Sequence, residues 1–278
     1  MAGKKSALSK LAKAVGKATR EKTFEEQFMV MMDEFYQKRA KVLHEKHQKK
    51  HSKALYRPSM LWNCHRNLFY YMTNAPEDPF MESNPEMERL GEDGSDRHYR
   101  IQKALGELKD YGYPFEVVPL NELLGGKPHL QAIEATGEHS SGETRWYWPE
   151  LELAFQPDGI AQYLGKIFFL EIKTAEMFKF NGVNFNNIPI KNQVQTWAYS
   201  LGTGLNYCFY LYEDRNYKRW KPMFVPIIDE QRQEVVDRIR QNQEYRRIGE
   251  LPPCELDRCK KSYCKYRYQC RQDGGTPQ

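Results

Sequence analysis

Two carboxylates and a lysine, Asp158, Glu171 and Lys173, stand in one short stretch of the chain. Residues 159–163 and 167–172 have the pattern of two strands joined by a turn, and a hairpin places its arms side by side. Asp158 opens the first arm and Glu171 closes the second, so we expect their carboxylates to meet across the pair. Two oxygen ligands arranged in this way suit Mg²⁺ or Mn²⁺.

Lys173 lies two residues after Glu171, and side chains two apart on a strand point to the same face. Its amine can therefore reach whatever the metal holds, and a metal beside a cation is suited to hydrolysing a phosphodiester. Desolvation near a divalent ion would lower the pKa of Lys173. Such acids and lysines are also common on solvated surfaces. The apolar run around Glu171 argues against that alternative, because a charge in a buried strand needs a partner.

Two further motifs flank the hairpin. His98 lies near the start of a helical pattern over residues 94–111, and Gln195 and Tyr199 lie four apart on one face of a predicted helix over residues 190–201. Taken in order, the motifs resemble those of RecB-type exonucleases of the PD-(D/E)XK superfamily, over about residues 57–271.

The resemblance implies an α/β fold, with a PD-(D/E)XK nuclease core in which helices flank a mixed central sheet. It implies that His98 and the Ile172 carbonyl join Asp158 and Glu171 as ligands of Mg or Mn. Gln195 and Tyr199 would contact the substrate strand or support the site. The implied activity is that of a metal-dependent DNA exonuclease acting on linear or single-stranded DNA. A structure-specific or restriction-type endonuclease of the same superfamily is the alternative.

Six cysteines are present, and four of them crowd the last 25 residues with the spacing C-x4-C-x4-C-x5-C. Four thiolates can hold a [4Fe–4S] cluster or Zn²⁺. The resemblance favours the iron–sulfur branch, in which one early cysteine joins three near the C-terminus. This implies the ligands Cys64, Cys259, Cys264 and Cys270, although Cys254 competes with Cys259 for one position. Cys208 lies in an apolar run and is interpreted as a buried small hydrophobe.

The composition, with 28% charged and 40% hydrophobic residues over 278 positions, is ordinary for a globular protein. No apolar run approaches the length of a membrane span, and no secretory pattern is present, so we expect a cytoplasmic protein, or one in a host cytoplasm if a phage encodes it. A reducing compartment disfavours disulfides. The net charge of +5 is uneven, because residues 1–57 hold fifteen Lys and Arg against six acids.

The predicted organisation has three parts. Residues 1–56 form a basic, partly disordered helical extension, residues 57–271 form the nuclease domain with its cysteine clasp, and residues 272–278 form a disordered tail. A long helix over residues 23–53 carries an apolar stripe and a basic run that suits nucleic-acid phosphate or a protein partner.

Within the nuclease domain we expect a helix over residues 59–73, a connection over 74–93 and a loop over 179–189. A non-catalytic nucleic-acid-binding protein with a zinc-stapled tail is a further alternative, disfavoured by the intact Asp158, Glu171 and Lys173 set.

Overall fold

The computed structural model describes residues 23–50, 55–78, 85–133, 145–255, 257–259 and 264–275. These form two compact units, one with helix α2 (Phe24–Lys50) and the start of α4 as far as Leu90, the other with the described residues from 55 onward. The long N-terminal helix is confirmed as α2, and its apolar side chains Phe28, Met31 and Phe35 are about half exposed. The predicted basic tail before residue 23 lies outside the described residues.

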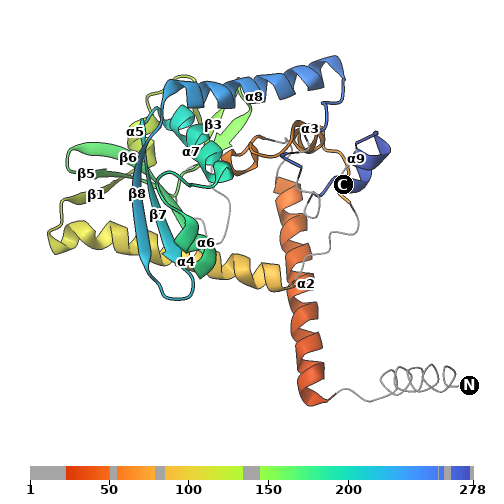
Figure 1. The fold of residues 1–278 in the computed structure, drawn as a ribbon, viewed down its shortest axis with the longest axis horizontal. Coiled ribbons are helices and arrows are strands. Elements are labelled where there is room, and N and C mark those ends of the chain that lie inside the picture. Colours follow the sequence, from red (N-terminus) through yellow and green to blue (C-terminus); the bar gives the residue numbers. More distant parts are fainter. Residues whose placement is uncertain are drawn as a thin grey trace, which may run out of the picture. The chain divides into compact units, whose positions relative to one another are not determined.

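A mixed sheet forms the centre of the second unit (Figure 1). Its strand order is β1-β5-β6-β7-β8, and β6 and β7 pair in parallel while the other neighbours are antiparallel. A smaller antiparallel sheet has the order β2-β3-β4. The strands are β1 (Phe115–Val118), β2 (Gln131–Ile133), β3 (Arg145–Trp148), β4 (Leu153–Phe155), β5 (Gly159–Tyr163), β6 (Lys166–Ala175), β7 (Tyr207–Asp214) and β8 (Trp220–Pro226).

Helices cover both faces of the mixed sheet, which confirms the predicted fold class. Helices α7 and α8 lie on one face, and the part of α4 from residue 91 onward lies on the other (Figure 1). The helices of this unit are α3 (His65–Met72), α4 (Pro85–Glu107), α5 (Leu120–Leu124), α6 (Met177–Gly182), α7 (Ile190–Thr203), α8 (Asp229–Ile248) and α9 (Arg267–Gln272), with short 3-10 turns η1 (Pro58–Met60) and η2 (Leu108–Tyr111).

Strand β6 is buried on both faces, and its alternation decides where the polar residues point. Phe168, Leu170 and Ile172 pack with the apolar side chains of α4, whereas Phe169 packs with those of α7 and α8. Because alternate residues share a face, Glu171 and Lys173 face α7 with Phe169. The two charged side chains therefore lie on the side of the sheet that α7 covers.

Three local predictions were wrong. Helix α4 begins at Pro85, not near residue 94, because proline is well placed in a first helical turn. The predicted helix over 59–73 is divided into η1 and α3, because Cys64 has extended backbone (φ −60°, ψ 155°) and forms the N-cap of α3. Helix α6 occupies the start of the segment that we expected to be a loop.

We expect Gly202→Ala to destabilise the contact between α7 and β4. A Cβ at this position would lie 2.5 Å from the Phe155 ring, which is itself buried. Overpacking of this kind costs about 1–3 kcal/mol of unfolding free energy, measurable by urea unfolding. Gly106→Ala on α4 is the matched control, because nothing lies within 4 Å of the added methyl group. Equal stability of the two variants would contradict the prediction.

Candidate active site

The hairpin of β5 and β6 brings the two predicted carboxylates together. Gly159 pairs with Leu170, so Asp158 lies level with Glu171 across the ladder. The Ile172 N–H donates to Asp158 Oδ2 at 2.6 Å, which holds that carboxylate against the end of β6. His98 approaches from α4, with its Nδ1 3.7 Å from Asp158 Oδ1. The structure thus gathers His98, Asp158, Glu171 and the backbone of Ile172 at one end of the hairpin.

Glu171 is fully buried. The Lys173 ammonium forms an ion pair with Glu171 Oε1, but no described residue donates a hydrogen bond of normal geometry to either carboxylate oxygen. Burial, with a smaller contribution from the charge of Asp158, raises the pKa of Glu171 to about 7 against the opposing charges of Lys173 and His98. A buried carboxylate with so few donors is costly to ionise, and a bound cation would relieve that cost.

Lys173 connects this carboxylate to helix α7. Its Nζ donates to Gln195 Oε1 at 3.1 Å, and Gln195 Nε2 in turn donates to the Tyr199 hydroxyl at 3.1 Å. Tyr199 is buried, with its ring 6.0 Å from that of Phe169. Lys173, Gln195 and Tyr199 therefore form one chain of hydrogen bonds, in which Tyr199 supports Gln195.

The carboxylates around Lys173 raise its pKa. Burial lowers it, but the charges of Glu171 and Asp158 together outweigh burial, so the pKa lies above its ordinary value. The lowered pKa expected for Lys173 beside a bound divalent ion stays a prediction, because the structure contains no ion. Lys173 is thus a charged ammonium held between a carboxylate and the amide oxygen of Gln195.

Residues that sequence reasoning missed fix the orientation of α7. Asn192 Nδ2 donates to the Tyr212 hydroxyl at 2.7 Å, and the Thr196 and Tyr210 hydroxyls share a hydrogen bond of 2.6 Å. These contacts anchor one face of α7 to β7, so Gln195 is presented to Lys173. The sequence contained a signal for these contacts. Asn192 and Thr196 are four apart on a helix and so share a face, and Tyr210 and Tyr212 are two apart on a strand and so share a face as well.

A second missed group fixes the helix that carries His98. Glu213 on β7 is fully buried and forms ion pairs with Arg97 and Arg100, which lie on either side of His98. Its carboxylate also accepts a hydrogen bond from Trp220 Nε1 at 3.2 Å. The two arginines therefore fasten α4 to the sheet near His98.

The cysteine region forms a separate site. A cavity of about 350 Å³ lies between α3 and the C-terminal segment, and both Cys64 and Cys264 line it. Burial raises the pKa of the Cys64 thiol to about 12, and the charges of Cys264 and Cys259 add to that rise. None of the six cysteines, all of which the structure describes, is in a disulfide. Within the described ranges, no three His, Cys, Asp or Glu side chains are arranged to hold an ion, and this applies to His98, Asp158 and Glu171 as well as to the cysteines.

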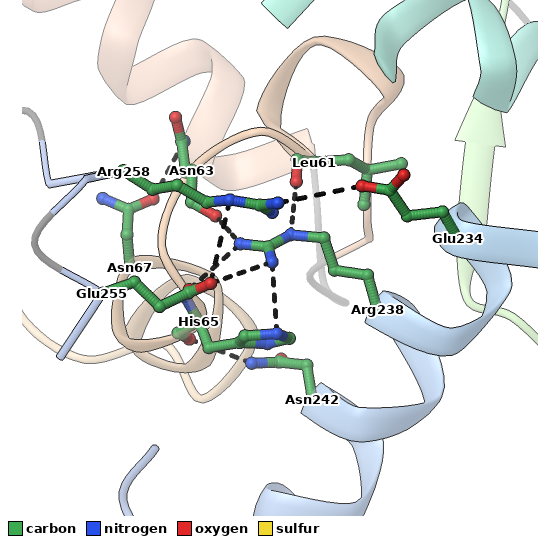
Figure 2. Close-up of polar contacts among 9 residues, drawn as sticks. All are labelled: Leu61, Asn63, His65, Asn67, Glu234, Arg238, Asn242, Glu255 and Arg258. Carbon is green, nitrogen blue, oxygen red and sulfur yellow. Dashed lines mark hydrogen bonds and ion pairs between the residues drawn. The ribbon is translucent and has the colours of Figure 1, made fainter. Parts of the chain in front are cut away.

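An arginine of α8 holds the C-terminal segment near the start of α3 (Figure 2). Arg238 is buried, and its guanidinium donates to acceptors from two segments of the chain, residues 61–65 and Glu255. These acceptors are the Leu61 and Asn63 carbonyls, the His65 ring and the Glu255 carboxylate. Glu255 also accepts from the His65 N–H at 2.5 Å, so it occupies the N-terminus of α3. The cysteine-bearing segment is thus held in place by the ion pair between Arg238 and Glu255.

We expect acidification from pH 6.5 to pH 4 to destabilise this junction. Burial, with the charge of Arg238, lowers the pKa of His65 from 6.5 to about 4. In that window the unfolded chain binds a proton that the folded chain does not, so the free energy of unfolding falls as pH falls. Urea unfolding at several pH values measures the slope. His65→Gln keeps an acceptor for Arg238 but cannot titrate, and an equally steep slope in this variant would contradict the prediction.

No family model and no curated protein matches the chain. Among solved structures it is similar to SSO0001, with 15% identity over 90% of this chain and 98% of that one and a TM-score of 0.45. It is also similar to the alkaline exonuclease LHK-Exo from Laribacter hongkongensis, with 9% identity over 70% and 89% of the two chains and a TM-score of 0.38.

The same exonuclease in complex with dAMP matches with 11% identity over 80% of this chain and 94% of that one, and a TM-score of 0.41. All three scores are low, so any function must be argued from the site residues. Among the described residues, no helix is both long and apolar enough to cross a membrane.

Proposed function

We propose that this chain is a metal-dependent deoxyribonuclease of the PD-(D/E)XK superfamily that hydrolyses phosphodiester bonds as an exonuclease. The observation that carries the proposal is the fully buried Glu171 carboxylate, level with Asp158 and in contact with Lys173. Lys173 offsets part of this buried charge, but no described residue gives either Glu171 oxygen a hydrogen bond of normal geometry, so a divalent ion would stabilise the carboxylate further. Two carboxylates and an imidazole offer the donor set that Mg²⁺ or Mn²⁺ accepts.

In this proposal Asp158, Glu171, His98 and the Ile172 carbonyl hold the ion. When bound, the ion would lower the pKa of a water and offset phosphate charge. Gln195 holds the Lys173 ammonium beside Glu171, where it can orient that water or contact a phosphate oxygen. Tyr199 is a positioning residue, because it is buried and acts through Gln195. The substrate is linear or single-stranded DNA, and the protein acts in the cytoplasm.

The test is cleavage of linear and covalently closed circular DNA of the same sequence, with Mg²⁺ and with a chelator. We expect the linear DNA to be degraded from its ends only when Mg²⁺ is present, while the circle stays intact. Cleavage of the circle would instead identify an endonuclease. Tight binding of both substrates without cleavage of either would overturn the enzymatic proposal in favour of a DNA-binding protein.

We also propose that Cys64, Cys259, Cys264 and Cys270 hold a [4Fe–4S] cluster that fastens the C-terminal segment to α3. Three observations support it: Cys64 and Cys264 line one cavity, the charge of Cys259 acts on the Cys64 thiol, and Cys270 packs with the aromatic residues of α3 and the tail. Cys259 is among the groups with the largest effects on the pKa of Cys64, which supports Cys259 as the ligand.

We expect protein purified without oxygen to be coloured and to contain about four irons per chain. Cys64→Ser and Cys264→Ser should lose both the colour and the iron, because each removes a thiolate ligand. Cys208→Ala is the control, because Cys208 is buried in the core between α7 and the sheet. A colourless protein with one zinc would contradict the iron assignment. Loss of iron in Cys254→Ser, but not in Cys259→Ser, would contradict the ligand choice.

A further inference from the structure

Two arginines flank the strand that leads to Asp158. Strand β3 runs antiparallel to β4 with Trp146 opposite Phe155, so Arg145 lies level with the residues between Phe155 and Asp158. On the other side of β4, Tyr56 pairs with Leu153 in parallel, with the Ala154 N–H bound to the Tyr56 carbonyl at 2.9 Å. Arg57 follows Tyr56, and because this segment is parallel to β4, it leads in the same direction as β4, toward Asp158.

The two positive charges act on one another. Arg145 is half-buried, and both burial and the charge of Arg57 lower its pKa. The same environment includes Tyr199, which supports the proposed active site, and Tyr71. Tyr71 and Arg57 both line the cavity beside α3. The pair therefore lies between this cavity and the Tyr199 end of the proposed catalytic residues.

Neither arginine has an anionic partner in the part of the chain that the structure describes, where neither guanidinium forms a hydrogen bond or ion pair. Other arginines of the region are satisfied: Arg258 pairs with Glu234 and Glu255, and Arg66 donates to the Pro252 carbonyl at 2.7 Å. Two like charges brought together without an acid repel one another, most strongly where water is partly excluded. A phosphate accepts paired N–H donors from arginine and would neutralise both.

We propose that Arg57 and Arg145 bind a phosphate of the substrate strand that flanks the scissile one. This inference rests on the proposed nuclease function, because it assigns the path of the strand past Asp158. The position beside β4 places the contact outside the Asp158, Glu171 and Lys173 group. The pair would thus fix the register of the strand on the ion-binding residues without taking part in the chemistry.

The experiment measures binding of fluorescent single-stranded oligonucleotides by anisotropy, with Ca²⁺ in place of Mg²⁺ to prevent cleavage. Each oligonucleotide carries one neutral methylphosphonate at a different linkage, and one series carries a terminal phosphate while the other does not. For the unmodified protein, we expect that making one particular linkage neutral, or omitting the terminal phosphate, lowers the affinity roughly tenfold. This is the effect of losing one charged hydrogen bond.

Arg145→Ala and Arg57→Ala should bind the native oligonucleotide about tenfold more weakly, and the salt slope of each should fall by about one. Neither variant should respond to the linkage that the unmodified protein senses. Lys109→Ala is the matched control, because Lys109 is an exposed cation paired with Glu116 on the edge strand β1. In cleavage assays KM should rise in the arginine variants while kcat changes little.

Arg57 is exposed, so Arg57→Ala keeps the test informative if Arg145→Ala folds poorly. If an arginine variant lost further affinity when the same linkage was made neutral, so that the two losses were additive, the subsite would be overturned. Unchanged affinity and KM in both variants of a protein that cleaves DNA would overturn the subsite alone. An unmodified protein that neither binds nor cleaves DNA would overturn the proposed function and the subsite together.

Discussion

Asp158→Ala and Glu171→Ala are each expected to lower the rate of DNA cleavage by roughly a thousandfold or more, the upper end of the cost of removing one electrostatic contact from an active site. Both should also lose affinity for Mn²⁺, because each removes a carboxylate from the set that faces His98. Lys173→Ala should lose a comparable amount of activity but keep its metal affinity, since the ammonium is not a ligand. Single-turnover cleavage and calorimetric titration with Mn²⁺ measure the two quantities.

Gln162→Ala is the matched control, because Gln162 lies on β5 of the same hairpin with its side chain exposed. It should leave both activity and metal affinity unchanged. Substantial cleavage by any one of the three active-site variants would remove the hairpin from the site. Tight Mn²⁺ binding by both of the single variants, Asp158→Ala and Glu171→Ala, would show that the ion is held elsewhere.

Arg238→Ala is expected to reduce the free energy of unfolding by about 3–5 kcal/mol, the cost of breaking a buried ion pair by removing one partner. The change removes the Arg238 donor from the His65 ring, from two backbone carbonyls and from the Glu255 carboxylate, which among the described residues keeps only the His65 N–H and the ion pair with Arg258. The C-terminal segment should also become more sensitive to proteases, because Arg238 is one of the polar groups that connect it to the start of α3. Urea unfolding and limited proteolysis of the same samples measure the two effects.

Arg240→Ala on the same helix provides the control. Arg240 forms an ion pair with Glu150, but both side chains are more than half exposed, so the loss should stay within about 1 kcal/mol. The loss of unfolding free energy in Glu255→Gln should lie between those of Arg238→Ala and Arg240→Ala, since an amide oxygen can still accept from Arg238. If Arg238→Ala were no less stable than Arg240→Ala, the metal site or the apolar core would have to hold the tail.

Local patterns were sufficient to predict the hairpin. Strand β5 has the predicted bounds, and β6 begins one residue before its predicted start. A hairpin is a contact between neighbours in the chain, and the two-residue period decides which side chains share a face. The same reasoning placed Gln195 and Tyr199 on one face of α7, since residues four apart on a helix are adjacent.

The sequence by itself therefore determined the order of the motifs, the hairpin that brings Asp158 level with Glu171, and the side of the strand to which Lys173 points. Only the tertiary structure decided that Glu213 would fasten the His98 helix, that Arg238 would bind acceptors from residues 61–65 and from Glu255, and that Arg57 would lie close enough to act on Arg145. Each of these contacts joins residues far apart in the chain, and a side chain's type does not reveal which distant partner packing will bring to it. Burial then makes that partner essential, because a charge removed from water must be matched by the groups that the fold brings around it.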